Sequence, residues 1–185
     1  MLAARLGLRH ASEESVARVL SKPAQRAALH VAGLDPTPFR VAEAPAALPA
    51  AVAAVGVPAV VKPVRGAGGA ATYRVTSPAE ARVLAERIDP ARFPYVAEHE
   101  LQPHPDLVGA PWGDYVSVES VVVDGVAHAL AVTGKAPLAP PYREQGGFVP
   151  AALDADAERD VVDLAARAVV ALGFEHGLVH TEPEA

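Results

Sequence analysis

The most constraining feature of the sequence is an apolar run, Ala59–Val64, that is broken only by Lys62 and is followed by a glycine-rich loop. The run is short and rich in valine, which is typical of a buried strand. After the loop, residues 72–75 alternate between polar and apolar side chains, which predicts a second strand. The sequence therefore predicts two strands joined by a glycine-rich loop, with one lysine on the first strand.

The loop itself, Gly66-Ala-Gly-Gly-Ala-Ala71, fits the dinucleotide-binding pattern G-x-G-x-x-A. In that class of protein the loop opens a helix whose N-terminus holds the pyrophosphate, whereas this loop leads into a predicted strand. A P-loop is excluded as well, because no Gly-Lys-Ser/Thr sequence follows. Two interpretations stay open. The loop closes over phosphates with its backbone N–H groups and the help of Lys62, or it is the turn of an ordinary hairpin.

The lysines are informative because the chain has only three, at positions 22, 62 and 135, against thirteen arginines. A buried, unpaired ammonium group costs several kcal/mol, so Lys62 should have an anionic partner. Lys22 is predicted at the start of a helix, where the helix dipole disfavours a cation unless an anionic ligand is bound there. The alternative for Lys22 is a solvated residue at a frayed helix end.

Composition narrows the classes of function. The length of 185 residues allows one domain or two small lobes. The formal net charge of -6 argues against binding to nucleic acid or to an anionic membrane surface by bulk charge. Without cysteine, the chain has no disulfide, thiolate metal site or cysteine nucleophile. The N-terminus lacks the pattern of a secretory signal, and the uncharged run over 44–61 is broken by proline and glycine, so we expect a cytoplasmic protein without a membrane span.

The rest of the chain predicts a mixture of helices and strands. Asp124-Gly125 between two valine-rich runs is a strong hairpin signal, and Ser77-Pro-Ala-Glu80 is a strong helix start. We expect the helix after Ser77 to bury Val83, Leu84 and Ile88. Predicted helices cover 2–8, a short stretch capped by Ser12, 22–33 capped by Ser21, 46–55, 78–88 and 157–172. Predicted strands cover 39–41, 59–64, 72–75, 95–98, 115–123, 126–132 and 177–181, whereas 102–114 and 135–150 are predicted to be irregular.

Acidic residues on strands are further candidates for a site. The segment Glu98-His-Glu-Leu101 ends a predicted strand, where backbone N–H and C=O groups are free to pair with a base edge. A zinc-binding helix through His99 and His104 is not expected, because the spacing is five residues and the prolines at 103 and 105 forbid a helix. Glu119 interrupts an apolar strand and Glu182 ends the last strand. Each is a ligand-binding residue, for Mg²⁺ in the case of Glu182, or a solvated side chain.

Taken in order, these features resemble the ATP-grasp superfamily over residues 2–182. The Lys-Pro-x-x-Gly loop at 62–66, the Glu-x-Gly-x-x-x-Pro stretch at 144–150 and the Gly-x-x-His-Thr-Glu strand at 177–182 are similar to those of ATP-dependent carboxylate–amine ligases, above all the L-amino-acid ligases. The resemblance implies an α+β fold of two lobes with the nucleotide between them. Residues 1–20 would be the remnant of a preceding domain or linker, 21–101 the N-terminal lobe with the lid, and 102–185 part of the C-terminal lobe.

The resemblance also implies roles for individual residues, with ATP and Mg²⁺ as cofactors and a small carboxylate and an amine as substrates. Lys135 and Glu144 would lie near the phosphates and the acceptor substrate, and Arg143 would replace the family's catalytic arginine. A homo-oligomer is compatible with these expectations. The resemblance implies that Lys22 and Lys62 bind the ATP phosphates and that a lid over those phosphates is formed by Ala67, Gly68, Gly69, Ala70, Ala71 and Thr72. It also implies that adenine is bound by Glu98, His99, Glu100 and Leu101, the ribose by Glu119 and Mg²⁺ by Glu182.

The sequence departs from the family pattern in three places. The lid has Gly69-Ala-Ala71 where relatives usually carry a serine, a bulky or basic residue and a glycine, which predicts a weaker grip on phosphate. The family's preceding α/β domain and its later Glu-x-Asn-x-Arg segment have no counterpart in these 185 residues. We therefore expect the chain to be a fragment or a shortened relative. The resemblance implies that the complete enzyme works through an acyl-phosphate intermediate. The alternative is a non-catalytic ATP-binding module or partner subunit.

Overall fold

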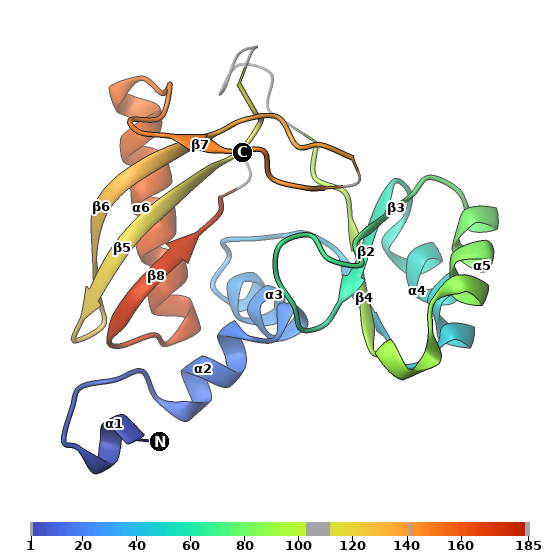
Figure 1. Ribbon diagram of the computed structural model, residues 1–185, viewed down its shortest axis with the longest axis horizontal. Coiled ribbons are helices and arrows are strands. Elements are labelled where there is room, and N and C mark those ends of the chain that lie inside the picture. Colours follow the sequence, from blue (N-terminus) through green and yellow to red (C-terminus); the bar gives the residue numbers. More distant parts are fainter. Residues whose placement is uncertain (1, 103–111, 141, 184–185) are drawn as a thin grey trace. The chain divides into compact units, whose positions relative to one another are not determined.

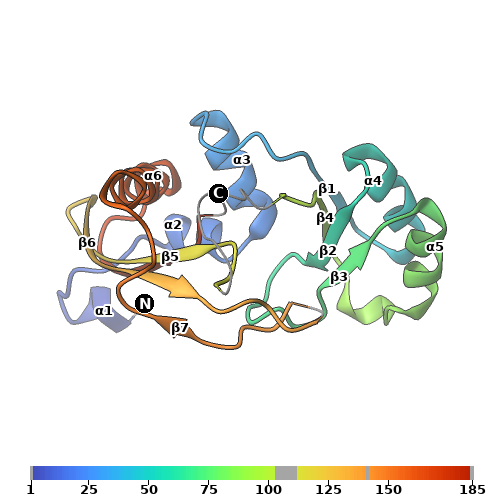
Figure 2. The same cartoon turned by 90° about the horizontal axis from the view of Figure 1, so that it is seen from above.

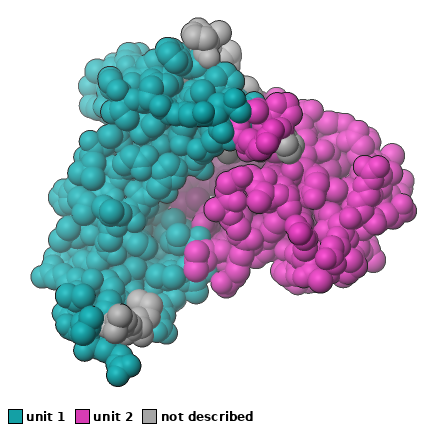
Figure 3. Space-filling model, viewed as in Figure 1, with its two compact units in different colours: residues 1–19, 103–138, 144–185 teal, residues 20–102, 139–143 magenta. Residues whose placement is uncertain are grey.

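The computed structural model describes residues 2–102, 112–140 and 142–183. The chain forms two compact units (Figure 3). Unit 1 consists of residues 1–19, 103–138 and 144–185, and unit 2 of residues 20–102 and 139–143. Each unit has a four-stranded antiparallel sheet accompanied by helices, which confirms the predicted α+β class. The predicted boundaries after residues 20 and 101 refer to functional lobes and stay predictions.

The sheet of unit 2 has the strand order β1-β4-β2-β3 (Figure 2), and all of its neighbouring strands are antiparallel. Its strands are β1 (Phe39–Ala42), β2 (Ala59–Pro63), β3 (Tyr73–Val75) and β4 (Tyr95–His99). Ala59 of β2 lies opposite Val75 of β3, so the glycine-rich loop joins two paired strands. The predicted strand–loop–strand is confirmed, and the loop does not open a helix as a dinucleotide-binding loop would.

Two helices cover one face of this sheet, α4 (Leu48–Val55) and α5 (Pro78–Arg87), each with a short 3-10 turn next to it along the chain, η1 (Pro45–Ala47) and η2 (Pro90–Arg92). They lie on the same side of the strands in both views (Figures 1 and 2). Ala59 and Val61 of β2 and Tyr95 and Ala97 of β4 are fully buried under them. Side chains alternate along a strand, so Lys62 and Glu98 belong to the opposite face.

Of the serines predicted to cap helices, Ser77 caps its helix but Ser21 does not. Ser77 accepts a hydrogen bond from the N–H of Glu80 at 3.2 Å, as predicted. Ser21 precedes α3 (Lys22–Val31) without a side-chain cap, so that prediction was wrong. At this helix start the N–H of Lys22 donates to the carbonyl of Val64 at 3.0 Å and the next residue is proline, so fewer free N–H groups need a cap.

The predicted inner face of the helix after Ser77 is confirmed at Leu84 and Ile88 and wrong at Val83. Ala81 is fully buried and Ile88 nearly so, but Val83 is 48% exposed. Leu84 and Ala85 pack against the core, which centres the buried stripe on positions 81, 84, 85 and 88. All four positions follow the three-and-four spacing of a helix face, and Val83 lies outside that stripe.

The sheet of unit 1 has the order β7-β6-β5-β8 and is also antiparallel. Its strands are β5 (Val116–Val123), β6 (Val126–Lys135), β7 (Gly147–Phe148) and β8 (Gly177–Thr181). The predicted hairpin at Asp124-Gly125 is confirmed, with φ of 50° and 78° at the two turn residues. Helix α6 (Ala155–Leu172) packs on one face through Val161 and Ala165, which contact the valines of β5 and β6.

Strand β7 lies in the stretch 135–150 that was predicted to be irregular, so that prediction was wrong at two residues. The ring of Phe148 lies on Gly134 of β6, where an added Cβ would come within 2.3 Å of a ring atom. The pairing therefore depends on the absence of a side chain at Gly134, which a periodicity argument does not detect. Two short helices, α1 (Leu2–Arg5) and α2 (Glu13–Val19), precede the rest of the unit. No helix among the described residues has the length and apolar character that crossing a membrane requires.

Candidate functional site

Four charged side chains form a cluster around the buried Glu98 in unit 2: Arg26 on α3, Asp35 in the loop after α3, Lys62 on β2 and Glu98 on β4. One carboxylate oxygen of Glu98, Oε2, accepts from three nitrogens: Arg26 Nε at 3.2 Å, Arg26 Nη2 at 2.8 Å and Lys62 Nζ at 2.9 Å. The remaining Arg26 nitrogen, Nη1, pairs with Asp35. Asp35 in turn accepts from the N–H of Thr37 at 2.8 Å. The anionic partner predicted for Lys62 is thus a carboxylate of the protein itself.

Glu98 and Arg26 keep their charges although both side chains are largely withdrawn from solvent. The Glu98 side chain is only 3% exposed, and that burial by itself would raise its pKa. The charges of Lys62 and Arg26 outweigh burial, so the pKa of Glu98 lies below its ordinary value. Burial opposes the charge of Arg26 too, but Glu98 and Asp35 raise its pKa. The second oxygen of Glu98, Oε1, is buried without a hydrogen-bond partner among the described residues.

Lys22 lies at the start of α3 and contacts the glycine-rich loop, since its Nζ donates to the carbonyl of Gly66 at 2.8 Å. Burial and the positive charge of Lys62 lower the pKa of Lys22, and Glu98 partly offsets them. The N–H of Lys22 also donates to the carbonyl of Val64 at 3.0 Å, two residues after Lys62, so both lysines lie where β2 leads into the loop. The two lysines singled out in the sequence are therefore brought together with the loop that follows β2.

The glycine-rich loop is a series of tight turns. Gly66, Gly68 and Gly69 have positive φ values, and so does Ala71, with φ of 56°. The N–H of Thr72 donates to the carbonyl of Gly69 at 3.2 Å, and Thr72 is buried. Of the predicted lid residues, Ala67, Gly68 and Ala70 are exposed. The loop thus presents backbone to solvent over its first half and is anchored at Thr72.

The segment 98–101 has less free backbone than predicted. Glu98 lies inside the sheet, opposite Phe39 of β1 and Val60 of β2. The N–H of His99 donates to Pro38 at 3.0 Å and that of Glu100 to Pro58 at 2.9 Å. These residues therefore do not offer a free N–H to a base, because their donors complete the sheet. Leu101 follows the strand, is 38% exposed and has no backbone hydrogen bond within the described part of the chain.

Glu100 connects three segments of unit 2. Both of its carboxylate oxygens accept from Arg74 Nε of β3 at 2.8 Å, and Oε1 also accepts from the hydroxyl of Tyr142 at 3.0 Å. These hydrogen bonds outweigh burial and lower the pKa of Glu100. Tyr142 belongs to a tight turn that is closed by two backbone hydrogen bonds between Ala139 and Arg143, at 2.8 and 2.7 Å. This turn, residues 139–143, also approaches Gly69, where a Cβ would lie 2.4 Å from the Tyr142 carbonyl oxygen.

In unit 1, His180 of β8 bridges two acidic residues. Its Nδ1 lies 3.0 and 2.9 Å from the two oxygens of Glu119 on β5, and its Nε2 lies 3.2 Å from Glu182. Both contacts are hydrogen bonds only when the ring carries two protons. Burial lowers the pKa of His180, but its hydrogen bonds to Glu119 and Glu182 raise it above the ordinary value. Ser117 also donates to Glu119, at 2.9 Å, so this carboxylate is already well supplied with donors.

Lys135 ends β6 as a nearly buried cation, with its side chain 6% exposed. Its Nζ lies 3.6 Å from Glu144, 3.7 Å from Glu182 and 5.6 Å from the ring centroid of Tyr115. The structure thus gathers Lys135, Glu144 and Glu182, which lie up to 47 positions apart in the sequence. Arg143 is exposed and its backbone closes the 139–143 turn.

The described residues contain no group of three or more His, Asp or Glu side chains arranged to hold a metal ion. Glu182 is a single carboxylate beside Lys135 and His180, at the end of β8. Mg²⁺ commonly uses one or two carboxylates together with phosphate oxygens and water, so this donor set fits a metal that arrives with a nucleotide. His104, which the sequence analysis rejected as part of a zinc-binding helix, lies outside the described residues.

The sequence analysis missed Arg26, Asp35 and Tyr142. Arg26 carried a detectable signal, because it lies four positions after Lys22 and so on the same face of the helix. Asp35 and Tyr142 lie in turns and have no periodic signal of their own. Their roles depend on partners that are 9 and 42 positions away in the sequence.

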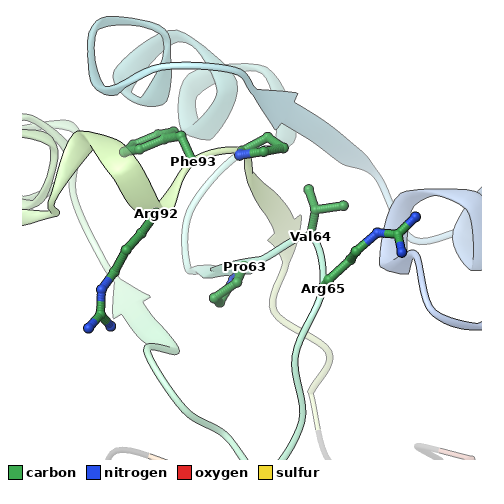
Figure 4. A pocket seen from close by; sticks show the side chains of 6 residues that line it. Pro63, Val64, Arg65, Arg92 and Phe93 are labelled. Atoms are coloured by element: carbon green, nitrogen blue, oxygen red, sulfur yellow. The ribbon is translucent and has the colours of Figure 1, made fainter.

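A shallow pocket of about 220 Å³ lies elsewhere in unit 2 (Figure 4). Its lining residues are Pro63, Val64, Arg65, Arg92, Phe93 and Pro94. Figure 4 shows the guanidinium groups of Arg65 and Arg92 pointing away from each other. The pocket therefore does not direct both cations at one ligand, and none of the predicted site residues lines it.

Comparison with known proteins points to one group of enzymes. No family model matches the chain. Alanine–anticapsin ligases from Bacillus amyloliquefaciens and Bacillus subtilis are each 28% identical to it over 192 residues, which is 96% of this chain and 40% of theirs. The crystal structure of an L-amino acid ligase from Bacillus licheniformis matches with a TM-score of 0.76 and 24% identity, over 97% of this chain and 40% of that one.

Another solved structure, D-alanyl-alanine synthetase A from Vibrio cholerae, matches with a TM-score of 0.72 and 13% identity, over 98% of this chain and 56% of that one. At these identities the structural matches establish the fold. The chain spans about 40% of the length of the curated relatives that it matches.

Proposed function

We propose, from the ATP-grasp fold that this chain shares with those ligases, that it binds ATP and supplies the nucleotide-binding part of an ATP-dependent carboxylate–amine ligase acting on amino-acid-like substrates. The observation that carries the proposal is in unit 2. Lys22, Lys62 and the glycine-rich loop gather there at one place, with Lys22 bonded to the loop at Gly66. Two cations beside a turn with exposed backbone form a suitable surface for a polyphosphate.

The proposed roles follow the two units. In unit 2, Lys22 and Lys62 contact the phosphates, residues 67–72 close over them, and residues 98–101 hold adenine. Leu101 is the best candidate for a backbone donor to the base, because the N–H groups of His99 and Glu100 are already bonded. In unit 1, Glu119 holds the ribose, and a ribose hydroxyl would share its carboxylate with His180 and Ser117.

The proposed reaction has two steps. A carboxylate oxygen of the first substrate attacks the γ-phosphorus of ATP, the bond from that phosphorus to the bridging oxygen breaks, and ADP leaves with the electron pair. The amine of the second substrate then attacks the acyl carbon, loses a proton and expels inorganic phosphate, which leaves an amide. Lys135 and Arg143 would neutralise charge on the transferred phosphoryl group, and Glu144 would orient the acceptor. Catalysis of this type rests on positioning and charge neutralisation.

Glu182 would hold Mg²⁺, which when bound neutralises phosphate charge during transfer. The placement of Glu182 3.7 Å from Lys135 supports this role, because a carboxylate and a cation at the end of one sheet would engage the same phosphates.

The proposal is tested by calorimetric titration of the 185-residue chain with Mg·ATP, Mg·GTP and NAD. We expect ATP to bind and GTP to bind more weakly, and Lys62→Met to weaken ATP binding. Arg87→Met, which removes one exposed positive charge at the end of α5, is the matched control and should bind ATP normally. Binding of NAD but not ATP, or equal affinity for ATP and GTP, would contradict the proposal.

Phosphate release with a panel of amino acids separates the ligase from the alternative of a non-catalytic ATP-binding module. Release that depends on two amino acids supports the ligase. ATP binding without such release supports the module.

A further inference from the structure

The least expected residue of the unit 2 cluster is Arg26, which no motif singled out. It provides two of the three donors at Glu98 Oε2, and its third nitrogen pairs with Asp35. Its side chain is 19% exposed, so it is largely withdrawn from solvent. Arg26 is therefore held between two carboxylates instead of being directed at a ligand.

The charges of this cluster balance only because of Arg26. Glu98 and Asp35 carry two negative charges, and Arg26 and Lys62 carry two positive charges. Without Arg26 the cluster would have a net charge of -1, and the ammonium of Lys62 would be the sole cation against the buried carboxylate of Glu98. In a poorly solvated site, such a charge acts on a nearby anion with little screening.

We propose that Arg26 is a positioning residue for polyphosphate binding: it neutralises Glu98 so that the positive charge of Lys62 is available to an anionic ligand. Arg26 acts through Glu98 and Lys62 and does not itself touch the ligand. The inference rests on the proposed function, because it takes the anion to be the phosphate chain of ATP. It goes further by making phosphate affinity depend on a residue outside every recognised motif.

The test measures the dissociation constants of ATP, inorganic tripolyphosphate and adenosine for the 185-residue chain and three variants, Arg26→Met, Arg26→Lys and Arg87→Met. Arg26→Met should weaken binding of ATP and tripolyphosphate about tenfold or more, with adenosine changed by less than about threefold. Arg26→Lys retains the charge and should stay within about threefold of the wild type for ATP. Arg87→Met lies on the helix-covered side of the sheet and should change none of the three constants.

Three results would overturn the inference. If folded Arg26→Met binds ATP with unchanged affinity, the charge of Arg26 is not needed for phosphate binding. If the affinities for ATP and adenosine fall equally, Arg26 has a purely structural role. A tenfold loss with Arg26→Lys contradicts the charge account and also decides the question if Arg26→Met does not fold. If the wild-type chain binds no ATP, the proposed function and this inference both fail. If the wild type binds ATP and the Arg26 variants bind it equally well, only the inference fails.

Discussion

At the scale of single residues, the unusual feature is a carboxylate that is almost completely buried and still ionised. Glu98 is 3% exposed and depends on Lys62 and Arg26 for its neutralisation. Removing one partner of a buried ion pair is strongly destabilising, because the other charge stays buried without compensation. The same lysine that the sequence suggests for phosphate binding is therefore also needed for the stability of unit 2.

This dual role makes a testable prediction for Lys62. Lys62→Met should lower the free energy of unfolding by about 2 kcal/mol, less than for a fully isolated charge because Arg26 remains. The double variant Lys62→Met/Glu98→Gln should recover part of that loss, since it also removes the buried negative charge. Urea unfolding of the four proteins of this double-mutant cycle gives the coupling energy. A coupling near zero would mean that the 2.9 Å contact contributes nothing to stability.

A second prediction at this scale concerns pH. The pKa of Glu98 is lowered from its ordinary value of 4.5, so unfolding takes up a proton as the pH falls through this range. Its contribution to stability is fully present above pH 4.5 and is lost as the pH falls through the lower pKa of the folded state. Glu98→Gln should therefore have a flatter dependence of unfolding free energy on pH below 4.5 than the wild type. Parallel curves in this range would show that Glu98 is not the group responsible.

At the scale of elements, the glycine-rich loop and the 139–143 turn contact each other within unit 2. Gly69 has φ of 66°, and a Cβ there would come within 2.4 Å of the Tyr142 carbonyl oxygen. Gly68 has the same φ but nothing within 4 Å of its would-be Cβ. Comparing alanine substitutions at the two positions therefore distinguishes the effect of backbone strain from that of a steric clash.

Gly69→Ala should displace the 139–143 turn and expose the backbone after Arg143, so trypsin should cleave there several-fold faster than in the wild type. Gly68→Ala carries the same left-handed strain of about 1 kcal/mol without the clash and is the matched control. Tyr142→Phe, which removes the 3.0 Å hydrogen bond to Glu100, should have an intermediate effect. Mass spectrometry of the first cleavage products measures these rates. Equal acceleration by both glycine variants would assign the effect to strain in the loop.

At the scale of the whole molecule, the proposed function assigns parts of one nucleotide to both units. Binding at 100 times Kd adds about 2.7 kcal/mol of stability, so saturating Mg·ATP should raise the unfolding temperature and GTP should raise it less. Hydrogen exchange then locates the effect. We expect ATP to slow exchange in 64–72 and 95–101 of unit 2 and in 177–182 of unit 1. Protection restricted to unit 2 would contradict the roles proposed for Glu119 and Glu182.

Much of the fold could be read from the sequence, because local patterns report local structure. The strand at 177–181, the Asp124-Gly125 hairpin and the strands on both sides of the glycine-rich loop agree with the structure, since alternation and turn chemistry act over a few residues. The errors at Ser21, Val83 and β7 have a shared cause. Each depends on what a distant segment packs against or bonds to, such as the carbonyl of Val64 for the start of α3.

The sequence by itself determined which residues carry chemistry: the rare lysines, the glycine-rich loop and the acidic residues on strands, since unusual residue types in apolar contexts need a reason. Only the tertiary structure decided how these residues are paired. Lys62 meets Glu98 because β2 and β4 are antiparallel neighbours. Glu98 meets Arg26 of α3, and Lys135 lies near Glu144 and Glu182, because the fold brings these distant segments together. A charge pattern along the chain identifies the ions, but their partners depend on distances in space, which the fold alone sets.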